Sequence, residues 1–310
     1  MPPKQLHLIR HAQGFHNLSV EAHNLPDPLL TPFGEQQCKE LSASILDIQS
    51  LGCIVASASR RTLYTALVTF APLLATKPNL NIIALPELQE TSDMPCDTGS
   101  SVEALNIEFA NKPVDLSHVH DGWNNKCSGP FEGRVDLVRK RCRKARQFLQ
   151  RIEEENVAVV SHGGLLHFLT DDWTGAREGC GTGWSNTELR TYAFDMSTDT
   201  NIANATIHET ETSLIRRKHT LKPLSNCEQI QLGAVAQRSW AEDGYITWAD
   251  APDATEATIQ DELSEDDDYD RDGKAMDSGV CVSPASFCEP DKDDAKAITE
   301  LLSCPAQLAV

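Results

Sequence analysis

Residues 5–17 read Gln-Leu-His-Leu-Ile-Arg-His-Ala-Gln-Gly-Phe-His-Asn, and this stretch says more about the fold than any other part of the chain. Its first half, residues 5–9, has the apolar character of a short buried strand. The strand ends on the pair Arg10 and His11. In open α/β folds, ligands bind at the carboxyl ends of the strands. The stretch therefore predicts a site at the end of a buried strand.

The side chains at this strand end suit phosphate chemistry. Arg10 offers a planar fork of donors that matches phosphate oxygens, and the neutral imidazole of His11 can attack phosphorus near pH 7. Gly14 lets the backbone approach an anion closely, and Asn17 can donate to a phosphate oxygen. An Arg-His pair by itself is more often a solvated strand end, so the interpretation depends on the rest of the chain.

A second apolar run also ends on a histidine. Residues 157–160 read Val-Ala-Val-Val and lead through Ser161 to His162, and Gly163 and Gly164 open a helical run. A histidine there lies beside free backbone amides at the positive end of a helix, which is an anion-binding position. His162 and Gly163 are therefore candidates for phosphate binding.

Two further strand-like runs precede charged residues. Residues 53–56 lead into a helix with Arg60 and Arg61 in its first turn, and residues 81–85 lead to Glu90. Because the carboxyl ends of parallel strands meet at one edge of a sheet, all four strand ends deliver their side chains to one place. Two arginines, two histidines and a carboxylate are expected there.

These elements resemble the histidine phosphatase superfamily, the phosphoglycerate-mutase-like proteins. The motif Arg-His-x-x-Gly matches at 10–14, Leu-Thr-x-x-Gly-x-x-Gln at 30–37, Ser-Pro-Leu-x-Arg-Thr at 57–62, Leu-x-Glu at 88–90 and Ser-His-Gly-Gly at 161–164. A Pro-Cys-Asp-Thr-Gly stretch at 95–99 resembles the fungal-type members most closely. The resemblance covers about residues 5–195 and is specific, because five elements occur in the family's order.

The resemblance implies a role for each matching residue. The catalytic residues would be His11 as nucleophile, Glu90 as general acid and base, and His162. The phosphate-binding residues would be Arg10, Asn17, Arg61 and Gly163. No metal ion and no other cofactor is expected.

The chain departs from the family pattern at three places. Ala58-Ser59 replaces the usual Pro-Leu, which alters the turn but leaves Arg61 in place. Glu90 lacks the Arg-x-Tyr-Gly that follows it in phosphoglycerate mutases, which argues against glycolytic mutase activity. His162 is followed by glycine, whereas the acid phosphatase and phytase branch has aspartate.

The function that these patterns favour is a metal-independent phosphatase. It would hydrolyse a small phosphorylated metabolite through a phosphohistidine intermediate. Two alternatives stay open: a phosphomutase of the phosphoglycerate mutase type, and a non-catalytic binding module on the same fold. The sequence does not indicate which phosphoester is the substrate.

Other chemistries have less support. No Gly-x-x-x-x-Gly-Lys-Ser/Thr loop is present, and no cysteine stands at the Cys-x5-Arg spacing of cysteine-dependent phosphatases. A metal hydrolase could use several histidines, but His7 and His167 lie in apolar contexts that are typical of structural histidines. Ten cysteines occur without a Cys-x-x-Cys pair, which disfavours a structural zinc site.

Charge divides the chain into two parts. Residues 250–310 carry 17 acidic and 4 basic residues, a net charge of −13 out of −19 for the whole chain. Such a segment cannot bury enough apolar surface to offset its ordering entropy. We therefore expect a phosphatase domain over residues 1–220 and a C-terminal extension over 221–310 that is acidic and largely disordered at 250–294.

The fold class follows from the alternation of elements. Strand-like runs alternate with helical patterns near 34–48, 60–75 and 131–153, and residues 189–194 suit an edge strand. This order predicts a three-layer α/β/α fold with a mostly parallel central sheet. The segment 112–130 lacks periodicity and is either a lid over the pocket or a passive insertion.

Composition also bears on location and partners. No apolar run approaches the roughly 20 residues that span a bilayer, and strand character starting at Gln5 leaves no room for a targeting segment. The excess of negative charge disfavours nucleic acid as a partner. A cytoplasmic protein that binds a small phosphoester, and neither a membrane nor nucleic acid, is the resulting expectation. The oligomeric state is not indicated.

Overall fold

The structure is a computed structural model that describes residues 2–45, 47–176, 182–218 and 224–248. Residues 1–249 form one compact unit. The acidic segment 250–294, expected to be disordered, lies outside the described residues. None of the helices in the described ranges is both long enough and apolar enough to cross a membrane.

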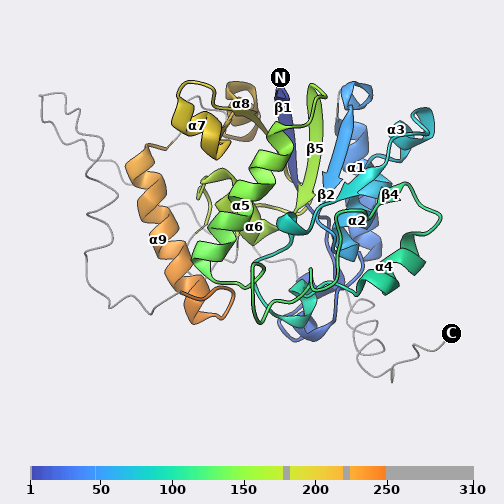
Figure 1. Ribbon diagram of the computed structural model, residues 1–310, viewed down its shortest axis with the longest axis horizontal. Helices are drawn as coiled ribbons and strands as arrows, with labels where there is room; N and C mark the ends of the chain where they lie inside the picture. Colours follow the sequence, from blue (N-terminus) through green and yellow to red (C-terminus); the bar gives the residue numbers. More distant parts are fainter. Residues whose placement is uncertain (1, 46, 177–181, 219–223, 249–310) are drawn as a thin grey trace, which may run out of the picture. The chain divides into compact units, whose positions relative to one another are not determined.

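One sheet of seven strands runs through the described part of the chain (Figure 1), in the order β4-β3-β2-β5-β1-β6-β7. The strands are β1 (Gln5–Arg10), β2 (Cys53–Ala56), β3 (Ile82–Ala84), β4 (Val114–Asp115), β5 (Asn156–Ser161), β6 (Leu189–Phe194) and β7 (Ile207–Glu209). The pairs from β4 to β1 are parallel, whereas β6 and β7 add to the β1 edge in antiparallel fashion. The predicted mostly parallel sheet is confirmed.

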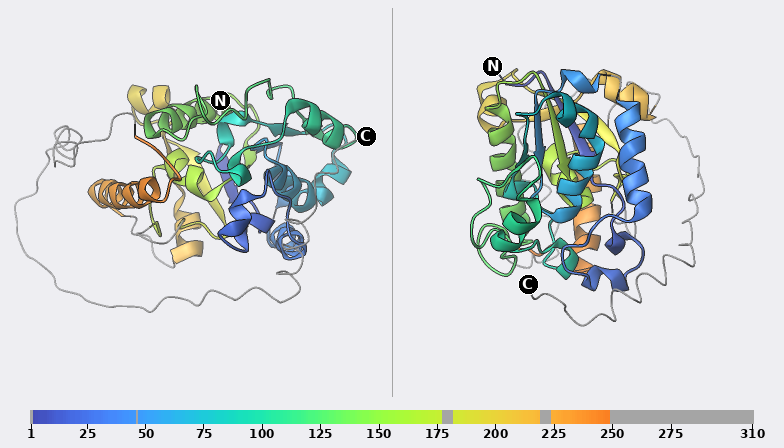
Figure 2. Two further views of the ribbon diagram at one scale, coloured as in Figure 1. Left: turned by 90° about the horizontal axis from the view of Figure 1, so that it is seen from below. Right: turned by 90° about the vertical axis from the view of Figure 1, so that its right-hand side faces the viewer.

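Helices cover both faces of this sheet. They are α1 (Pro32–Ser44), α2 (Arg60–Thr69), α3 (Ala71–Thr76), α4 (Val102–Phe109), α5 (Val135–Gln150), α6 (Gly163–Thr170), α7 (Asp199–Asn204), α8 (Glu211–Lys218) and α9 (Asn226–Glu242). In the right-hand view of Figure 2, α1 and α5 lie on opposite sides of the strands. The α/β/α layering predicted from the alternation of elements is confirmed.

The central strand β5 shows why both faces need a cover. Successive side chains of a strand point to opposite faces. Val157 and Val159 belong to a core cluster with residues of α5, α6 and α9, whereas Ala158 and Val160 belong to a second cluster with residues of α1, α2 and α3. Because all four side chains are fully buried, the strand reads as a continuous apolar run, as parallel strands do.

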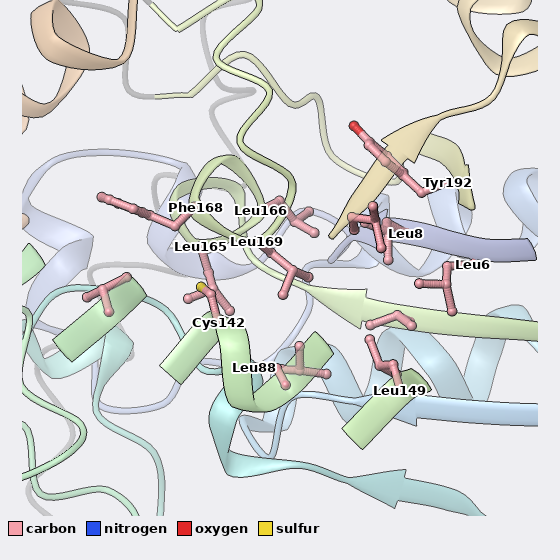
Figure 3. Packing of buried hydrophobic residues seen from close by; sticks show 14 of the residues in the cluster. Leu6, Leu8, Leu88, Cys142, Leu149, Leu165, Leu166, Phe168, Leu169 and Tyr192 are labelled. Carbon is pink, nitrogen blue, oxygen red and sulfur yellow. The ribbon is translucent and has the colours of Figure 1, made fainter. Parts of the chain in front are cut away.

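The first of these clusters anchors the helices that carry the site (Figure 3). In it, Leu6 and Leu8 of β1 pack with Cys142 of α5 and with Leu165 and Leu169 of α6. All of these side chains are fully buried. This packing fixes the start of α6 relative to the end of β1, and so fixes the two histidine-bearing segments relative to one another.

Two predicted helices differ from the observed ones for local reasons. The pattern at 60–75 forms two helices, α2 and α3, that meet at Phe70, because Pro72 begins the second helix and cannot continue the first. The pattern at 131–153 starts later, at Val135. Its first turn is preceded by an extended connection in which Thr247 exchanges backbone hydrogen bonds with Gly133 and Val135, at 2.9 Å each.

The compact unit also extends past residue 220, where the sequence placed its end. Helix α9 begins at a capping box formed by Ser225 and Glu228. It packs through Trp240, whose ring centroid lies 5.6 Å from that of Trp173 and 5.8 Å from that of His167. Its polar sequence hides this long-range contact, and the compact unit that includes the helix extends to residue 249.

Candidate active site

A cavity of about 170 Å³ opens where β1 and β5 end and α6 begins. Six of the seven residues predicted to form the site line it: Arg10, His11, Asn17, Arg61, Glu90 and Gly163. The seventh, His162, lies directly behind, with its ring centroid 5.2 Å from that of His11. The carboxyl edge of the sheet therefore gathers the set that the sequence singled out.

His11 is held in one orientation by the backbone. Its Nδ1 lies 2.8 Å from the carbonyl oxygen of Ala12, and since a carbonyl only accepts, Nδ1 donates. Nε2 of the neutral ring therefore keeps its lone pair. Burial above all, then the charges of Arg61 and Arg10, lower the pKa of His11 well below its ordinary value. The ring is thus uncharged over the whole neutral range, with a lone pair on Nε2.

Arg61 lies at the floor of the cavity and is only 1% exposed. Its Nη1 donates to the carbonyl of Cys96 at 2.5 Å, and its Nη2 donates to Oδ1 of Asp97 at 2.8 Å and to Nδ1 of His162 at 2.9 Å. Its buried Nε has no partner in the described structure. The guanidinium is fixed on two sides by three of its five N–H groups, and the Nε–H and the second Nη1–H remain.

His162 has both ring nitrogens engaged within the protein. Because Nδ1 accepts from Arg61, Nε2 carries the proton and donates to Oγ of Ser57 at 2.8 Å. The ring packs edge-on against His11 and is fully buried. In this arrangement both ring nitrogens of His162 are bonded to protein groups, and its predicted part in catalysis stays a prediction.

Glu90 lies at the N-terminus of α6. Its Oε2 accepts from the amide of Gly164 at 2.9 Å, and its Oε1 accepts from the amides of Leu165 at 2.7 Å and Thr91 at 3.0 Å. Burial first, and then the charge of Asp97, raise the pKa of Glu90, although the amides act in the opposite direction. A carboxyl group with a raised pKa suits the role of a general acid.

Gly164 is required for this placement of Glu90. A Cβ atom at residue 164 would lie 2.7 Å from Oε1 of Glu90, which is shorter than real Cβ contacts. Two buried cations hold the same stretch from behind, since Lys126 and Arg141 both donate to the Glu90 carbonyl oxygen. Burial and the charge of Arg141 lower the pKa of Lys126 well below its ordinary value. The acid is therefore held at both its side chain and its backbone.

Arg10 and Asn17, both predicted to bind phosphate, line the same cavity. Nη1 of Arg10 donates to the carbonyl of Trp184 at 2.5 Å, and its buried Nε has no partner among the described residues. Oδ1 of Asn17 accepts from the amide of Gly14 at 3.0 Å, which closes the turn after His11. The amide nitrogen of Asn17 remains to donate into the cavity that it lines.

Several lining residues were not assigned to the site from the sequence. His16 is buried, its ring centroid lies 5.3 Å from that of His11, and its Nδ1 has no partner among the described residues. Cys96 and Asp97 also line the cavity. The signals for these were present, because His16 stands within residues 10–17 and the other two within the stretch at 95–99. No sequence signal marked the remaining wall residues Trp240 and Tyr245, which follow the predicted domain.

The cavity also contains a thiol, which bears on the choice of nucleophile. Burial first, and the neighbouring charge of Asp97 second, raise the pKa of Cys96 far above its ordinary value. Since the thiolate is the nucleophilic form of cysteine, this thiol is inert at neutral pH. The pKa directions of the two groups therefore favour His11 over Cys96 as the candidate nucleophile.

The segment at 112–130, expected to be a lid or a passive insertion, supports the site from behind. Its Trp123 is buried, its indole Nε1 donates to the carbonyl of Ser100, and its own carbonyl accepts from Gln89. The described residues that line the cavity include none from this segment. Its contribution is to fix the loop that carries Glu90.

Two histidines considered as metal ligands lie outside the cavity. Nδ1 of His7 lies 3.3 Å from Oγ1 of Thr191, and Nδ1 of His167 lies 2.6 Å from the carbonyl of Asp172. Burial lowers the pKa of both to about 4. In the described residues, no group of three or more His, Cys, Asp or Glu side chains is arranged to hold a metal ion. Both histidines have the structural surroundings that their apolar sequence contexts suggested.

Comparison with known proteins identifies the class. Residues 6–200 match the sequence profile of the histidine phosphatase superfamily (branch 1). Because the match spans more than half of the chain, the protein belongs to this superfamily. The predicted family and enzyme class, a histidine phosphatase, are confirmed at this level.

The individual relatives that the chain resembles have low sequence identity to it. A phosphoglycerate mutase-like protein of Arabidopsis thaliana is 26% identical over 200 residues, which cover 54% of this chain and 73% of the relative. A putative phosphoserine phosphatase 2 of Hydrogenobacter thermophilus is 27% identical over 172 residues, covering 56% and 79%. A solved phosphoserine phosphatase mutant of Entamoeba histolytica, in complex with phosphoserine, is 18% identical with a TM-score of 0.41, covering 66% and 94%.

Proposed function

We propose that this protein hydrolyses a small phosphomonoester, with His11 as the nucleophile. The observation that carries the proposal is a set of buried side-chain nitrogens without partners on residues that line one cavity with His11. In the described structure they are Nε of Arg10, Nε of Arg61 and Nδ1 of His16. Because an unsatisfied buried polar group is costly and the two arginine groups are donors, this set favours an anion in the cavity.

In the first step, the lone pair of His11 Nε2 attacks phosphorus. The P–N bond forms as the bond from phosphorus to the ester oxygen breaks, and protonated Glu90 gives its proton to that oxygen. The leaving alcohol is then neutral. The donors of Arg10 and Arg61 bind the phosphoryl oxygens while charge redistributes over them.

In the second step, a water molecule attacks the phosphohistidine. The Glu90 carboxylate takes a proton from this water, the new P–O bond forms, and the P–N bond breaks with its electron pair returning to Nε2. The product is inorganic phosphate, and both side chains regain their starting protonation states. In this scheme His162 acts through His11 and Arg61 and is a positioning residue.

Phosphate release under metal-free conditions tests the proposal. The full chain would be incubated with phenyl phosphate and with 3-phosphoglycerate in the presence of a chelator, and both free phosphate and the ratio of phosphoglycerate isomers would be measured. We expect phosphate release from phenyl phosphate and no isomer exchange of the phosphoglycerate. Rapid exchange with negligible release would instead support a mutase, and inactivity on every ester would support a binding module.

The His11→Ala variant tests the covalent step. We expect at least about a 10,000-fold loss of turnover, because removing a nucleophile abolishes the chemical step. Acid-labile labelling by a ³²P-phosphomonoester should vanish with it. His208→Ala is the matched control, since His208 is exposed and lies in β7. Near-normal turnover in His11→Ala would contradict the mechanism.

A further inference from the structure

The cavity has two chemically different ends. Its inner end holds the arginines and His11, whereas its outer wall includes the aromatic side chains of Trp240 and Tyr245 and the ring of His23. The rings of His23 and Tyr245 meet edge-on with their centroids 6.3 Å apart. Both residues are partly exposed, so these rings stand at the opening rather than in the core. An organic group attached to the phosphate would meet them.

Positive charge is confined to the inner end. Of the described residues that line the cavity, Arg10 and Arg61 are the arginines, and no lysine is among them. Both Nη atoms of Arg61 are already bonded to protein acceptors, and so is Nη1 of Arg10. The donors that remain on these two residues are those that the phosphate itself would take.

Negative charge also faces the cavity. Asp97 lines it, and its carboxylate accepts from Arg61 and from the hydroxyl of Ser92 at 2.5 Å. Because Arg61 already pairs with Asp97, a carboxylate on the substrate would find no spare cation among the described lining residues. A charged group that enters a partly buried site without a counter-charge loses hydration that nothing there replaces.

The aromatic wall is built to keep its shape. Trp240 is buried against Trp173, and the amide of Tyr245 donates to the Trp240 carbonyl at 2.8 Å. Ile246 is buried in the main core cluster, and the next residue, Thr247, is bonded on both sides to the start of α5. A wall held by helix packing and by backbone pairing presents a preformed surface, which lowers the entropic cost of binding a ring.

We propose that the substrate is a phosphomonoester of an uncharged alcohol that carries an aromatic or similarly flat apolar group. Tyr245 and His23 bind that group at the cavity opening, while Arg10 and Arg61 bind the phosphate. This inference rests on the proposed function, because it takes the phosphoryl group to be transferred to His11. It excludes phosphoserine and 3-phosphoglycerate as good substrates, since both carry a carboxylate.

Three alkyl esters test separately the preference for an aromatic group and the exclusion of a carboxylate. Ethyl phosphate, 2-phenylethyl phosphate and 2-(4-carboxyphenyl)ethyl phosphate have the same type of primary alcohol leaving group, so their intrinsic reactivity is similar. We expect kcat/KM to be at least tenfold higher for the phenylethyl ester than for the ethyl ester. Adding the carboxylate should reverse this gain by tenfold or more.

The variant Tyr245→Leu locates the effect. It should lower kcat/KM for 2-phenylethyl phosphate several-fold more than for ethyl phosphate. The ratio of the two kcat/KM values should therefore fall. Trp248→Leu is the matched control, because Trp248 is an exposed aromatic residue three positions further along that does not line the cavity. It should leave the ratio unchanged. Thermal melting of both variants would show whether the fold is retained.

The outcomes distinguish the inference from the function beneath it. If none of the esters, including phenyl phosphate, releases phosphate, the proposed function fails. If phosphate is released but the carboxylated ester or phosphoserine is preferred, the function stands and the substrate class is overturned. An unchanged ratio in a folded Tyr245→Leu variant would overturn the role of the aromatic wall.

Discussion

The inner and outer ends of the cavity are built in different ways. The inner end comes from the ends of strands and the starts of helices: Arg10 is the last residue of β1, His11 follows it, and Arg61 is the second residue of α2. Two residues of the outer end, Trp240 on α9 and Tyr245 just beyond it, lie far along the chain, whereas its third ring, His23, lies near the start. The inner end lies within residues 6–200, which match the family, and these two outer residues lie after that match.

We therefore expect the inner end to determine the rate of the chemical step and the outer end to determine which substrate is preferred. A strand end fixes a side chain through the hydrogen bonds of the sheet, so the inner end has the rigidity that phosphoryl transfer needs. The outer wall is attached through the contacts of one helix, chiefly Trp240 against Trp173. Substitutions at the inner end should therefore reduce the rate on every ester. Substitutions at the outer end should instead change the relative kcat/KM values of different esters.

The largest effect expected from the variants below concerns Glu90. In Glu90→Gln, esters with poor leaving groups should lose about 1,000-fold in kcat because the leaving oxygen is no longer protonated. Aryl phosphates should lose far less. The wild-type rate on alkyl esters should also fall as pH rises through the raised pKa of Glu90, because the proton donor is then lost. Stopped assays across pH 5–9 check both points.

The pH profile makes the test of Glu90 specific. His11 stays neutral throughout this range because its pKa is lowered, so the alkaline fall is assigned to the acid rather than to the nucleophile. The fall should disappear in Glu90→Gln. Equal losses on alkyl and aryl esters would show instead that Glu90 serves only to hold the start of α6.

A smaller effect is expected from Gly164→Ala. The added methyl group would lie 2.7 Å from Oε1 of Glu90 and push the carboxyl group away from the α6 amides. A displacement of about 1 Å in a catalytic group costs on the order of 100-fold in rate. Gly122→Ala serves as a control for substituting a glycine, since nothing lies within 4 Å of that position, although its φ of 81° adds strain of its own. Wild-type rates in a folded Gly164→Ala protein would show that Gly164 is not needed to position the Glu90 carboxyl group.

The smallest effect in rate is expected at the outer wall. Trp240→Phe removes part of a buried ring that contacts Trp173, His167 and Phe168, which should lower the free energy of unfolding by about 1–3 kcal/mol. Urea denaturation measures this loss. Phosphohistidine labelling should persist and KM for 2-phenylethyl phosphate should rise a few-fold. Loss of phosphohistidine labelling in the folded variant would show that the outer wall also affects the chemical step at the inner end.

The sequence indicated the inner end well because its signals are local. Strands β2 and β6 have the predicted bounds, 53–56 and 189–194, since an apolar β-branched run is a property of neighbouring residues. Six predicted residues line one cavity for a similar reason, because parallel strand ends share an edge. Strand β4, with two residues, is too short to leave any periodic pattern.

What the sequence could not indicate depends on long-range contacts. The orientation of His162 follows from its bonds to Arg61 and Ser57, which are 101 and 105 residues away. Helix α9 has a mostly polar sequence, and its place in the unit depends on Gly233 passing close to the indole of Trp173. No window of the sequence contains either contact, so the wall and the true end of the compact unit appeared only in the structure.

The attachment of α9 has a consequence for how such enzymes diverge. A lineage can replace one helix and the turn after it without touching any strand end, because the wall joins the rest through Trp240 and the backbone bonds of Thr247. Substitutions within residues 224–248 could therefore reshape the outer wall while the strand-end residues of the cavity, and the motifs that define the family, stay as they are.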